Sequence, residues 1–257
     1  MKSILKAMAP RLVRRAVHRV RRYLESRRNA GRDPEYVFSN IYREGKWGTS
    51  LAKKRKEGAP YFSGTGSSSE TIVGPYVDAI RTQLQGYWSN KPRIVDLGCG
   101  DFTVGRHFLA QCSEYVGVDV VPDLIDHLRA TVQHDHVRFL CLDITSQDLP
   151  EGDVCLLRQV LQHLSNAQIL KIIPKLYKYQ RVYVTEHYPA DTKEIVPNRD
   201  KIHGADIRLY DNSGVYLDLP PFNLPSSMLE LILEVRAGDF GDLYEGGWIR
   251  TYMLKPT

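Results

Sequence analysis

Two glycines and a carboxylate at the ends of predicted strands are the residues of this sequence whose spacing could do chemistry. The apolar run 93–97 leads directly into Gly98-Cys99-Gly100, and the apolar run 115–119 ends on Asp119. A Gly-x-Gly pair between a strand and a helix lets the backbone pass close to a ligand, because no Cβ stands in the way. A carboxylate at the end of the next strand can accept hydrogen bonds from both hydroxyls of a ribose. The pattern therefore predicts a site for a ligand that carries a ribose.

A third strand end adds an acid of its own. Asp143 and Ile144 follow the apolar run 137–142, at a place where the edge of an adenine could be met. Together with Asp96 in the first run and Asp119 in the second, three successive strand ends each present an acid. Ligands of parallel sheets bind beyond the carboxyl ends of the strands, so these acids are expected to share one site.

The elements that must position these residues alternate between strand and helix. Strands are predicted at 93–97, 115–119, 137–142, 154–157, 181–185, 231–236 and 248–254. Helices are predicted at 70–85, 103–110, 122–132 and 165–179, and the last begins with a capping box of Ser165 and Gln168. Such alternation indicates a parallel sheet that is covered by helices on both faces.

These features resemble the class I S-adenosylmethionine-dependent methyltransferases over residues 74–254. The segment 95–100 resembles their first motif, Asp119 their ribose-binding acid and Asp143 their adenine-side acid. The resemblance implies an α/β, Rossmann-like, seven-stranded and mostly parallel sheet with the last strand antiparallel. It also implies S-adenosylmethionine as the cofactor. A dinucleotide enzyme is not expected, because Thr103 stands where that fingerprint has its third glycine.

The resemblance further implies which side chains meet the cofactor. Phe102 stands where many members have a third glycine, so this turn is expected to be bulkier. Trp47 and Tyr42 either close over the cofactor as a lid or fill a surface groove. Arg158 either neutralises the cofactor carboxylate or pairs with an acid of the fold. The expected cofactor-binding residues are Asp96, Gly98, Gly100, Phe102, Asp119, Val120, Asp143, Ile144, Arg158, Trp47 and Tyr42.

Two histidines follow strands on the cofactor side of the predicted sheet, and either could act as a general base. A hydroxyl is a poor nucleophile whose proton must leave as the new bond forms, and histidine titrates close to neutral pH. His163 follows the fourth strand and His187 the fifth, and a structural hydrogen bond is the alternative for each. Glu186 could orient an imidazole, or help to hold a divalent cation with nearby aspartates, although no spacing identifies a metal site.

The acceptor is expected to bind in the irregular stretch at about 187–228, where members of this class usually build that site. Arg199 and Arg208, beside Asn198, would suit an acidic or phosphorylated sugar. Ordinary charges on a surface loop are the alternative.

The acceptor itself is suggested by weaker resemblances. The segments 41–48, 198–200 and 219–225 resemble small methyltransferases of bacterial polysaccharide and glycan biosynthesis. The Asn/Asp-Pro-Pro-aromatic element of amino-methylating nucleic-acid enzymes is absent after the fourth strand. The leading hypothesis is therefore an O-methyltransferase that acts on a sugar, a glycan or another small hydroxylated acceptor. The alternatives are an RNA or protein methyltransferase, or a catalytically idle methyltransferase fold that serves as a binding module.

Charge is unevenly distributed along the 257 residues, although 42% hydrophobic and 25% charged residues are ordinary globular usage. Residues 1–30 contain ten Lys and Arg against Glu25 alone, whereas the whole chain carries +5, so the remainder is net acidic. Apolar residues recur among these arginines at three- and four-residue steps, which predicts a basic amphipathic helical arm. The arm could bind an anionic membrane surface, a protein partner or the protein's own body, or serve as a transit peptide or RNA-binding arm.

Three segments are therefore expected: the arm at 1–30, a polar lid or linker at 31–69, and the methyltransferase domain at 70–257. The linker includes a charge run at 53–57 and a Gly/Ser stretch at 63–69. No run approaches the 18 apolar residues of a spanning helix. Four cysteines without a CxxC pair indicate free thiols in a reducing compartment. The expected location is the cytoplasm, where the arm could hold the protein on the inner face of the membrane.

Overall fold

The computed structural model describes residues 11–47, 60–64, 66, 69–87, 90–190, 194–238 and 246–255. The first ten residues of the predicted arm, Gly48, the charge run 53–57 and part of the Gly/Ser stretch 63–69 lie outside the described residues. Within the described ranges, no helix is long and apolar enough to cross a membrane.

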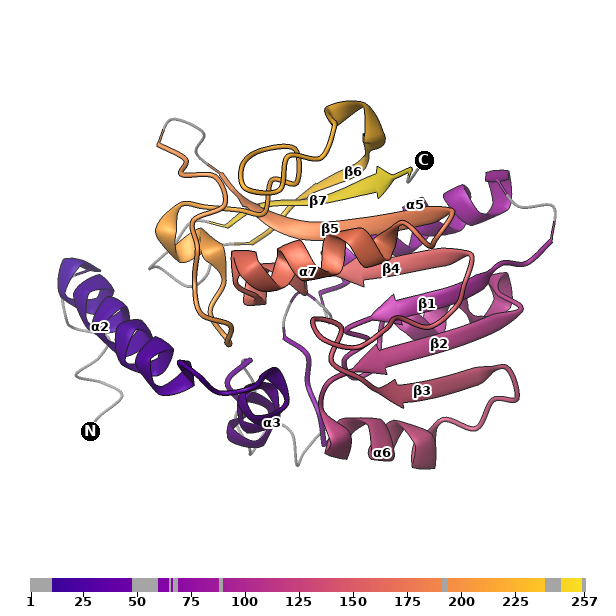
Figure 1. Cartoon of the computed structure of the whole chain (residues 1–257), viewed down its shortest axis with the longest axis horizontal. Coiled ribbons are helices and arrows are strands. Elements are labelled where there is room, and N and C mark those ends of the chain that lie inside the picture. The colour runs from indigo at the N-terminus through magenta and orange to yellow at the C-terminus, as the bar shows by residue number, and fades with distance from the viewer. Residues whose placement is uncertain are drawn as a thin grey trace.

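A seven-stranded sheet forms the centre of the molecule, in the order β3-β2-β1-β4-β5-β7-β6 (Figure 1). Strands β1 to β5 run parallel to one another, and β7 is inserted antiparallel between β5 and β6. The predicted Rossmann-like sheet with an antiparallel last strand is confirmed. The strands are β1 (Arg93–Leu97), β2 (Glu114–Asp119), β3 (Val137–Cys141), β4 (Val154–Arg158), β5 (Arg181–Pro189), β6 (Leu229–Arg236) and β7 (Gly247–Leu254).

Helices cover both faces of this sheet, and α5 and α7 lie on opposite sides of it in Figure 1. The predicted capping box is present at the start of α7, where the Ser165 side chain accepts from the Gln168 backbone N–H. The predicted helix at 103–110 is instead a 3₁₀ turn. The elements are α5 (Glu70–Tyr87), α6 (Pro122–Thr131), α7 (Asn166–Leu176) and the 3₁₀ turns η2 (Gly105–Gln111), η3 (Leu161–His163), η4 (Arg208–Asp211) and η5 (Ser226–Met228).

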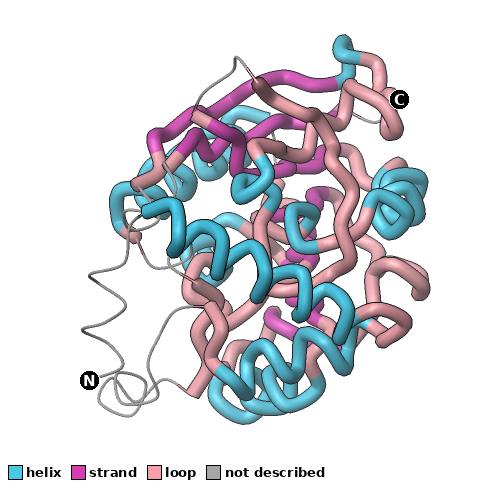
Figure 2. Tube along the Cα trace, turned by 90° about the vertical axis from the view of Figure 1, so that its left-hand side faces the viewer, coloured by secondary structure: helices cyan, strands magenta, loops and turns pink. Residues whose placement is uncertain are grey.

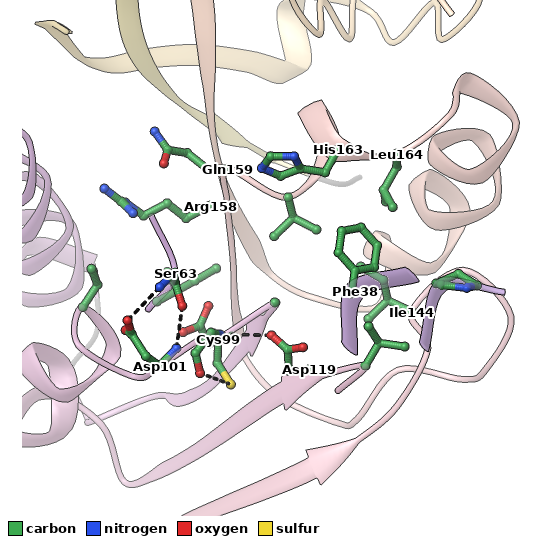
Figure 3. A pocket seen from close by; sticks show the side chains of 18 of the residues that line it. Phe38, Ser63, Cys99, Asp101, Asp119, Ile144, Arg158, Gln159, His163 and Leu164 are labelled. Carbon is green, nitrogen blue, oxygen red and sulfur yellow. Dashed lines mark hydrogen bonds between the residues drawn. The ribbon is translucent and has the colours of Figure 1, made fainter. Parts of the chain in front are cut away.

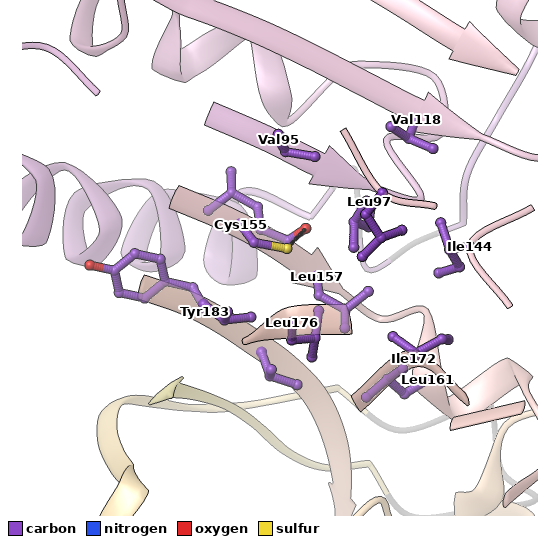
Figure 4. Packing of buried hydrophobic residues seen from close by; sticks show 14 of the residues in the cluster. Val95, Leu97, Val118, Ile144, Cys155, Leu157, Leu161, Ile172, Leu176 and Tyr183 are labelled. Atoms are coloured by element: carbon purple, nitrogen blue, oxygen red, sulfur yellow. Dashed lines mark hydrogen bonds between the residues drawn. The ribbon is translucent and has the colours of Figure 1, made fainter. Parts of the chain in front are cut away.

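The core lies between the sheet and these helices. Because both faces are covered, the central strands read as nearly continuous apolar runs rather than alternating ones. Leu97, Leu157 and Leu161 pack against Ile172 and Leu176 of α7 in a fully buried cluster (Figure 4). This rigid centre fixes the carboxyl ends of β1, β2 and β4, and so the loops that follow them.

A helix that sequence reasoning missed, α3 (Pro34–Glu44), lies in the stretch expected to be polar and loop-like. Asp33 caps it by accepting from the Tyr36 N–H at 2.7 Å, and Gly45 ends it with a left-handed φ of 64°. Its buried side chains are Val37, Phe38, Ile41 and Tyr42. Their spacing is that of an apolar helical face, which outweighs the polar average of the segment. In Figure 1, α3 lies off the carboxyl ends of β1 to β3.

The described part of the arm forms α2 (Arg11–Asn29), as its helical period predicts. This helix packs on the protein's own body along the irregular segment before η4, and Figure 2 shows it running across that face. Arg22 is the main contact, because its guanidinium reaches both Asp206 and Asp211. Packing on the body was one of the alternatives that the sequence left open.

Candidate active site

A pocket lies at the carboxyl ends of β1, β2 and β4, and it collects all the predicted cofactor-binding residues except Phe102 (Figure 3). The loop after β1 contributes the floor, α3 contributes Phe38 and Tyr42, and the turn after β4 contributes the far wall. The predicted residues that line it are Trp47, Tyr42, Asp96, Gly98, Gly100, Asp119, Val120, Asp143, Ile144 and Arg158.

Phe102 lies in the core beneath this pocket. Its backbone takes a φ of 62°, which glycine adopts without strain and other residues rarely do. The ring is only 1% exposed and packs edge-on against Tyr115 and Phe139, with centroids 5.3 and 5.1 Å away. The burial of an aromatic ring therefore offsets the backbone strain. Phe102 shapes the loop after β1, and its side chain turns away from the cofactor position.

The two glycines of the loop after β1 cannot be replaced by larger residues without steric clashes, because other side chains lie close to their Cα atoms. Gly98 has a φ of 77°, and a Cβ there would lie 2.4 Å from a methyl group of Val160. Gly100 has a φ of 55°, and a Cβ there would lie 2.4 Å from the Ser63 hydroxyl. The N–H groups of Gly98 and Cys99 both donate to the carbonyl of Val118, which ties the loop to the end of β2.

Asp119 and Asp96 are the two acids beside the glycine loop. One oxygen of Asp119 accepts from the Gly100 N–H at 3.1 Å and the other from the Val121 N–H at 3.2 Å. Burial raises the pKa of Asp119 to about 6 despite these donors. Burial likewise raises the pKa of Asp96 to about 6, and the Tyr115 hydroxyl donates to it. Two partly desolvated carboxylates thus face a pocket that can supply hydroxyl or amino donors to them.

The third acid, Asp143, is engaged with its own loop. Its carboxylate accepts from the N–H and the hydroxyl of Thr145 and from the hydroxyl of Ser146, at 2.8 to 3.0 Å. This arrangement presents Ile144 to the pocket, opposite Phe38 of α3 (Figure 3). The two apolar side chains form walls suited to a flat ring such as adenine. Asp143 contributes to this wall by holding the loop that carries Ile144.

A strap formed by residues 60–64 closes the pocket over the glycine loop. The Ser63 N–H donates to Asp101 at 2.9 Å, and the Asp101 N–H donates back to the Ser63 hydroxyl at 2.8 Å (Figure 3). The Tyr42 hydroxyl lies 3.0 Å from the same Ser63 hydroxyl, and its ring packs edge-on against Trp47. Ser63 begins the Gly/Ser stretch that was predicted to be a lid or a linker, but neither it nor Asp101 was predicted to line the cofactor pocket. The apolar spacing of α3 could have revealed Phe38.

Arg158 is the only Lys or Arg among the described residues that line this pocket. It donates to the carbonyl of Gly66 at 2.6 Å, and its guanidinium lies 5.0 Å from the ring centroid of Tyr76. Burial lowers its pKa, while Tyr76, Asp96 and Glu186 favour its charged form. The side chain is thus held by a backbone carbonyl, and it adds a positive charge to the pocket.

His163 lies where this pocket meets a second one, and it lines both. Its Nδ1 is 3.1 Å from the carbonyl of Gly204, which can only accept, so Nδ1 carries the hydrogen. Burial, with Lys201 and Arg208 adding to it, lowers the pKa of His163 to about 3. The ring is therefore neutral, and its unprotonated Nε2 accepts from the amide N–H of Gln162 at 3.5 Å, a long hydrogen bond that a ligand hydroxyl could replace.

Glu186 lies outside both pockets and holds the turn that carries His163. It is fully buried, and its carboxylate accepts from the N–H groups of Val160, Leu161 and Gln162 at 2.8 to 3.1 Å. Burial raises its pKa to about 8 against the effect of these three donors. Glu186 is thus a positioning residue, and its oxygens face backbone rather than an imidazole or a cation.

The second pocket is an open, polar cavity beside the first. It shares Trp47, Ser63, Gln159 and His163 with the cofactor pocket, and His187 lies on its wall. Burial lowers the pKa of His187 to about 4, so this ring is also neutral. The helix α2 forms one side of the cavity through residues His18, Arg21, Arg22 and Glu25.

Two glutamines at this junction escaped sequence reasoning. Gln159 has a φ of 55°, an uncommon conformation for glutamine that often marks a functional turn, and it lines both pockets. Gln162 is 5% exposed and lines the second cavity, yet its Oε1 has no hydrogen-bond partner among the described residues. A buried acceptor without a donor is costly, so this atom favours a ligand that brings an O–H or N–H. No sequence signal marks either position.

The three predicted substrate-binding residues do not line either pocket. The Asn198 amide donates to the carbonyls of Tyr216, Leu219 and Pro220, which closes the insert between β5 and β6 on itself. Arg208 is 2% exposed and donates to the carbonyls of Leu164 and Arg199. Arg199 is exposed to solvent. The structure therefore places Asn198 and Arg208 in the framework of the insert, where they donate to backbone carbonyls, and leaves the Arg199 side chain at the surface.

No three His, Cys, Asp or Glu side chains gather as a metal site would require, among the residues that the structure describes. The predicted role of Glu186 in holding a cation is not supported by its position, since three N–H groups occupy its oxygens.

The strand order and the pocket at the carboxyl ends of the strands match a Rossmann-like methyltransferase fold. Residues 94–181 match the family model described as a methyltransferase domain. No curated protein matches the chain in sequence. S-adenosylmethionine is the cofactor that this domain implies, and the residues fit it: Asp119 for the ribose, Phe38 and Ile144 for the adenine, and Arg158 for the carboxylate.

Solved methyltransferases share the fold at low identity. The N-methyltransferase NodS of Bradyrhizobium japonicum WM9 is 14% identical, with a TM-score of 0.51 over 74% of this chain and 98% of that one. The magnesium protoporphyrin IX methyltransferase of Synechocystis PCC 6803, solved with bound S-adenosylmethionine, is 16% identical, with a TM-score of 0.51 over 89% of this chain and 99% of that one. A Burkholderia thailandensis 1,6-didemethyltoxoflavin-N1-methyltransferase is 13% identical, with a TM-score of 0.51 over 88% and 92%. At these identities the likeness concerns the fold alone.

Proposed function

We propose that this protein is a class I S-adenosylmethionine-dependent O-methyltransferase whose hydroxylated acceptor enters the second cavity. The observation that carries the proposal is the position of His163 on the wall common to both pockets. A neutral imidazole with its Nδ1–H fixed on the Gly204 carbonyl offers Nε2 as a proton acceptor at that junction.

In the proposed reaction, one group of residues binds the cofactor and another handles the acceptor and its proton. S-adenosylmethionine would supply a methyl group on a positively charged sulfur, and transfer of that methyl to the acceptor oxygen would leave the sulfur as a neutral thioether. Asp119, Arg158 and the glycine loop orient the cofactor, and His163 Nε2 takes the hydroxyl proton. Gln162 Oε1 accepts from a further hydroxyl of the acceptor, and Glu186 keeps the intervening turn in place.

A sugar or glycan acceptor is the substrate class that this cavity favours. The buried amide of Gln162 with Gln159 suits a ligand with several hydroxyls, and Trp47 offers an aromatic face to the C–H side of a sugar ring. The cations and anions of the cavity nearly balance, because Arg22 is paired with Asp206 and Arg21 and Lys46 both lie near Glu25. A neutral sugar therefore fits better than a strongly acidic one. We place this activity in the cytoplasm, in bacterial polysaccharide biosynthesis.

A methyl-transfer screen tests this function. The full chain is incubated with methyl-labelled S-adenosylmethionine and nucleotide sugars, polysaccharide extracts or tRNA, and the label is followed. The expected result is alkali-stable label on a sugar hydroxyl. Label on tRNA alone would instead establish the RNA methyltransferase alternative. Tight cofactor binding without label on any acceptor class would favour an idle fold that serves as a binding module.

A further inference from the structure

The helix α2 exposes an apolar stripe on the side that faces away from the body. Val13, Val17, Val20 and Leu24 follow one another at three- and four-residue steps, and each is 50–60% exposed. Together with Tyr23, they make up five of the eleven exposed large hydrophobic side chains among the described residues. Single exposed apolar residues are ordinary on protein surfaces, but a continuous stripe marks an interaction site.

The opposite face of α2 is fixed, so the helix cannot turn this stripe inward. Arg22 pairs with Asp206 at 2.9 Å and with Asp211 at 2.6 Å, and its guanidinium lies 5.1 Å from the ring centroid of Tyr210. The ring of His18 packs edge-on against Tyr210, and Asn29 donates to the carbonyl of His203. The polar side of the helix thus binds the body, whereas an amphipathic surface helix ordinarily buries its apolar side.

Exposed cations flank the stripe. Arg19, Arg21, Arg27 and Arg28 are all exposed, and Glu25 is the only acid in the helix. Apolar side chains bordered by arginines match the acyl chains and phosphate groups of an anionic lipid surface, into which such helices insert in the plane of the interface. A protein partner would have to supply both an apolar groove and a ring of acids.

We propose that α2 docks this protein on an anionic lipid surface through Val13, Val17, Val20 and Leu24, with the flanking arginines on the headgroups. The same helix forms a side of the second cavity through His18, Arg21 and Arg22. Because the stripe and the cavity-lining His18 and Arg22 lie on opposite sides of this helix, docking would hold the cavity one helix diameter, roughly 10 Å, from the lipid surface. From this placement we infer that the acceptor sugar is carried on a membrane lipid. Only this inference about the acceptor rests on the proposed function.

Vesicle co-sedimentation of the full chain tests the docking. Vesicles of phosphatidylcholine with 30% phosphatidylglycerol are compared with pure phosphatidylcholine vesicles. The double variant Val17→Asp/Val20→Asp should lose at least tenfold in partition to the anionic vesicles. The matched control, Leu170→Asp, changes a helical leucine of similar exposure on α7 and should bind as the unmodified chain does. Binding should also weaken as salt rises, because the Debye length falls from about 10 Å at 0.1 M to about 3 Å at 1 M.

Several results would overturn the docking proposal. They are failure of the full chain to bind anionic vesicles, equal binding to pure phosphatidylcholine, or unchanged binding of the double variant. Self-association that the double variant abolishes, without vesicle binding, would assign the stripe to a second copy of the chain. Binding to tRNA with a steep salt slope, again without vesicle binding, would assign the arm to nucleic acid. Cofactor affinity measured on the same samples reports the methyltransferase pocket separately, so failure of one proposal is distinguishable from failure of the other.

Discussion

At the scale of single residues, His163 combines a fixed hydrogen with a low pKa. The Gly204 carbonyl holds its Nδ1–H at 3.1 Å, and burial with the nearby charges of Lys201 and Arg208 lowers its pKa to about 3. The protonated, inactive form is therefore populated only well below the ordinary pKa of 6.5. His163 should therefore stay unprotonated across the whole neutral range, and the same low pKa makes it a weaker base than an ordinary imidazole.

The first prediction concerns this residue's kinetics. His163→Ala should lose about 10²–10⁴-fold in turnover while cofactor affinity stays unchanged, because the base is removed and the cofactor contacts remain. The unmodified enzyme should keep constant kcat/KM from pH 8 down to pH 6, whereas an unperturbed histidine base would already lose activity near pH 6.5. Turnover within threefold of the unmodified enzyme for His163→Ala would show that the proton goes elsewhere. His187→Ala, at the other predicted base, is the parallel variant.

The second prediction concerns acid stability through His187. This side chain is buried, and burial lowers its pKa to about 4, so the folded protein binds its proton less readily than the unfolded chain. Its contribution to stability is therefore present above pH 6.5 and lost as the pH falls from 6.5 to about 4. His187→Gln should reduce the loss in unfolding free energy between pH 7 and pH 5 by up to about 2 kcal/mol. Urea unfolding at the two pH values measures this, and parallel pH profiles of the two proteins would disprove it.

The third prediction concerns Glu186 as a positioning residue. Glu186→Ala leaves three buried N–H groups without an acceptor, which should cost at least about 3 kcal/mol of unfolding free energy. Glu186→Gln retains one acceptor oxygen and should recover part of that stability and of kcat. Cofactor affinity should remain close to that of the unmodified protein in the Gln variant. A Gln variant no better than the Ala variant in both readouts would contradict a hydrogen-bonding role.

At the scale of elements, the strap and α3 complete the pocket that the sheet begins. Ser63 and Asp101 exchange two hydrogen bonds, and the Tyr42 hydroxyl of α3 lies within hydrogen-bond distance of the same serine.

The fourth prediction concerns this contact between the strap and the glycine loop. Ser63→Ala should weaken cofactor binding several-fold, because the strap loses its hydroxyl anchor on the glycine loop, while the unfolding free energy changes by about 1 kcal/mol. Calorimetry measures it, with Ser113→Ala as a control because this exposed serine lines neither pocket. An unchanged affinity of Ser63→Ala would show that the strap does not close the site.

The same scale shows which parts of the fold could be predicted from the sequence. The strands and the end of each one that carries an acid were predictable, because buried parallel strands leave apolar runs and the ligand must lie at their carboxyl ends. The helix α3 was missed because the apolar face of Phe38 and Tyr42 lies in a segment that is polar on average. The roles of Asn198 and Arg208 depend on which carbonyls the insert brings near them, and chain spacing does not reveal that.

The junction between the pockets was likewise beyond sequence reasoning. Gln159 adopts a left-handed backbone conformation, which a glutamine in a sequence does not predict. The Oε1 of Gln162 is buried without a hydrogen-bond partner among the described residues because of how the turn after β4 packs, and the sequence does not show that packing. Glu186 was predicted to orient an imidazole or to help hold a cation, but its partners are backbone N–H groups, which cannot be read from a sequence.

At the scale of the whole molecule, the protein separates three tasks. The carboxyl ends of β1 to β4 form the cofactor pocket, the cavity beside His163 is the proposed acceptor site, and α2 forms both a side of that cavity and an outward apolar stripe. The net acidic body and the basic arm are thus joined through Arg22 and its two aspartates. In this arrangement the same helix, α2, lines the second cavity and carries the proposed membrane-docking surface.

Calorimetric titration of the full chain with S-adenosylmethionine tests the central claim most directly. We predict one site per chain, with affinity weakened by about 1.5–3 kcal/mol, roughly 10- to 150-fold, in Asp119→Ala through the lost charge-assisted hydrogen bonds to the ribose. The control, Asp148→Ala, removes an exposed aspartate that lines neither pocket and should bind as the unmodified chain does. Absence of binding to the unmodified chain, or equal affinity in Asp119→Ala, would contradict the assignment of this pocket to the cofactor.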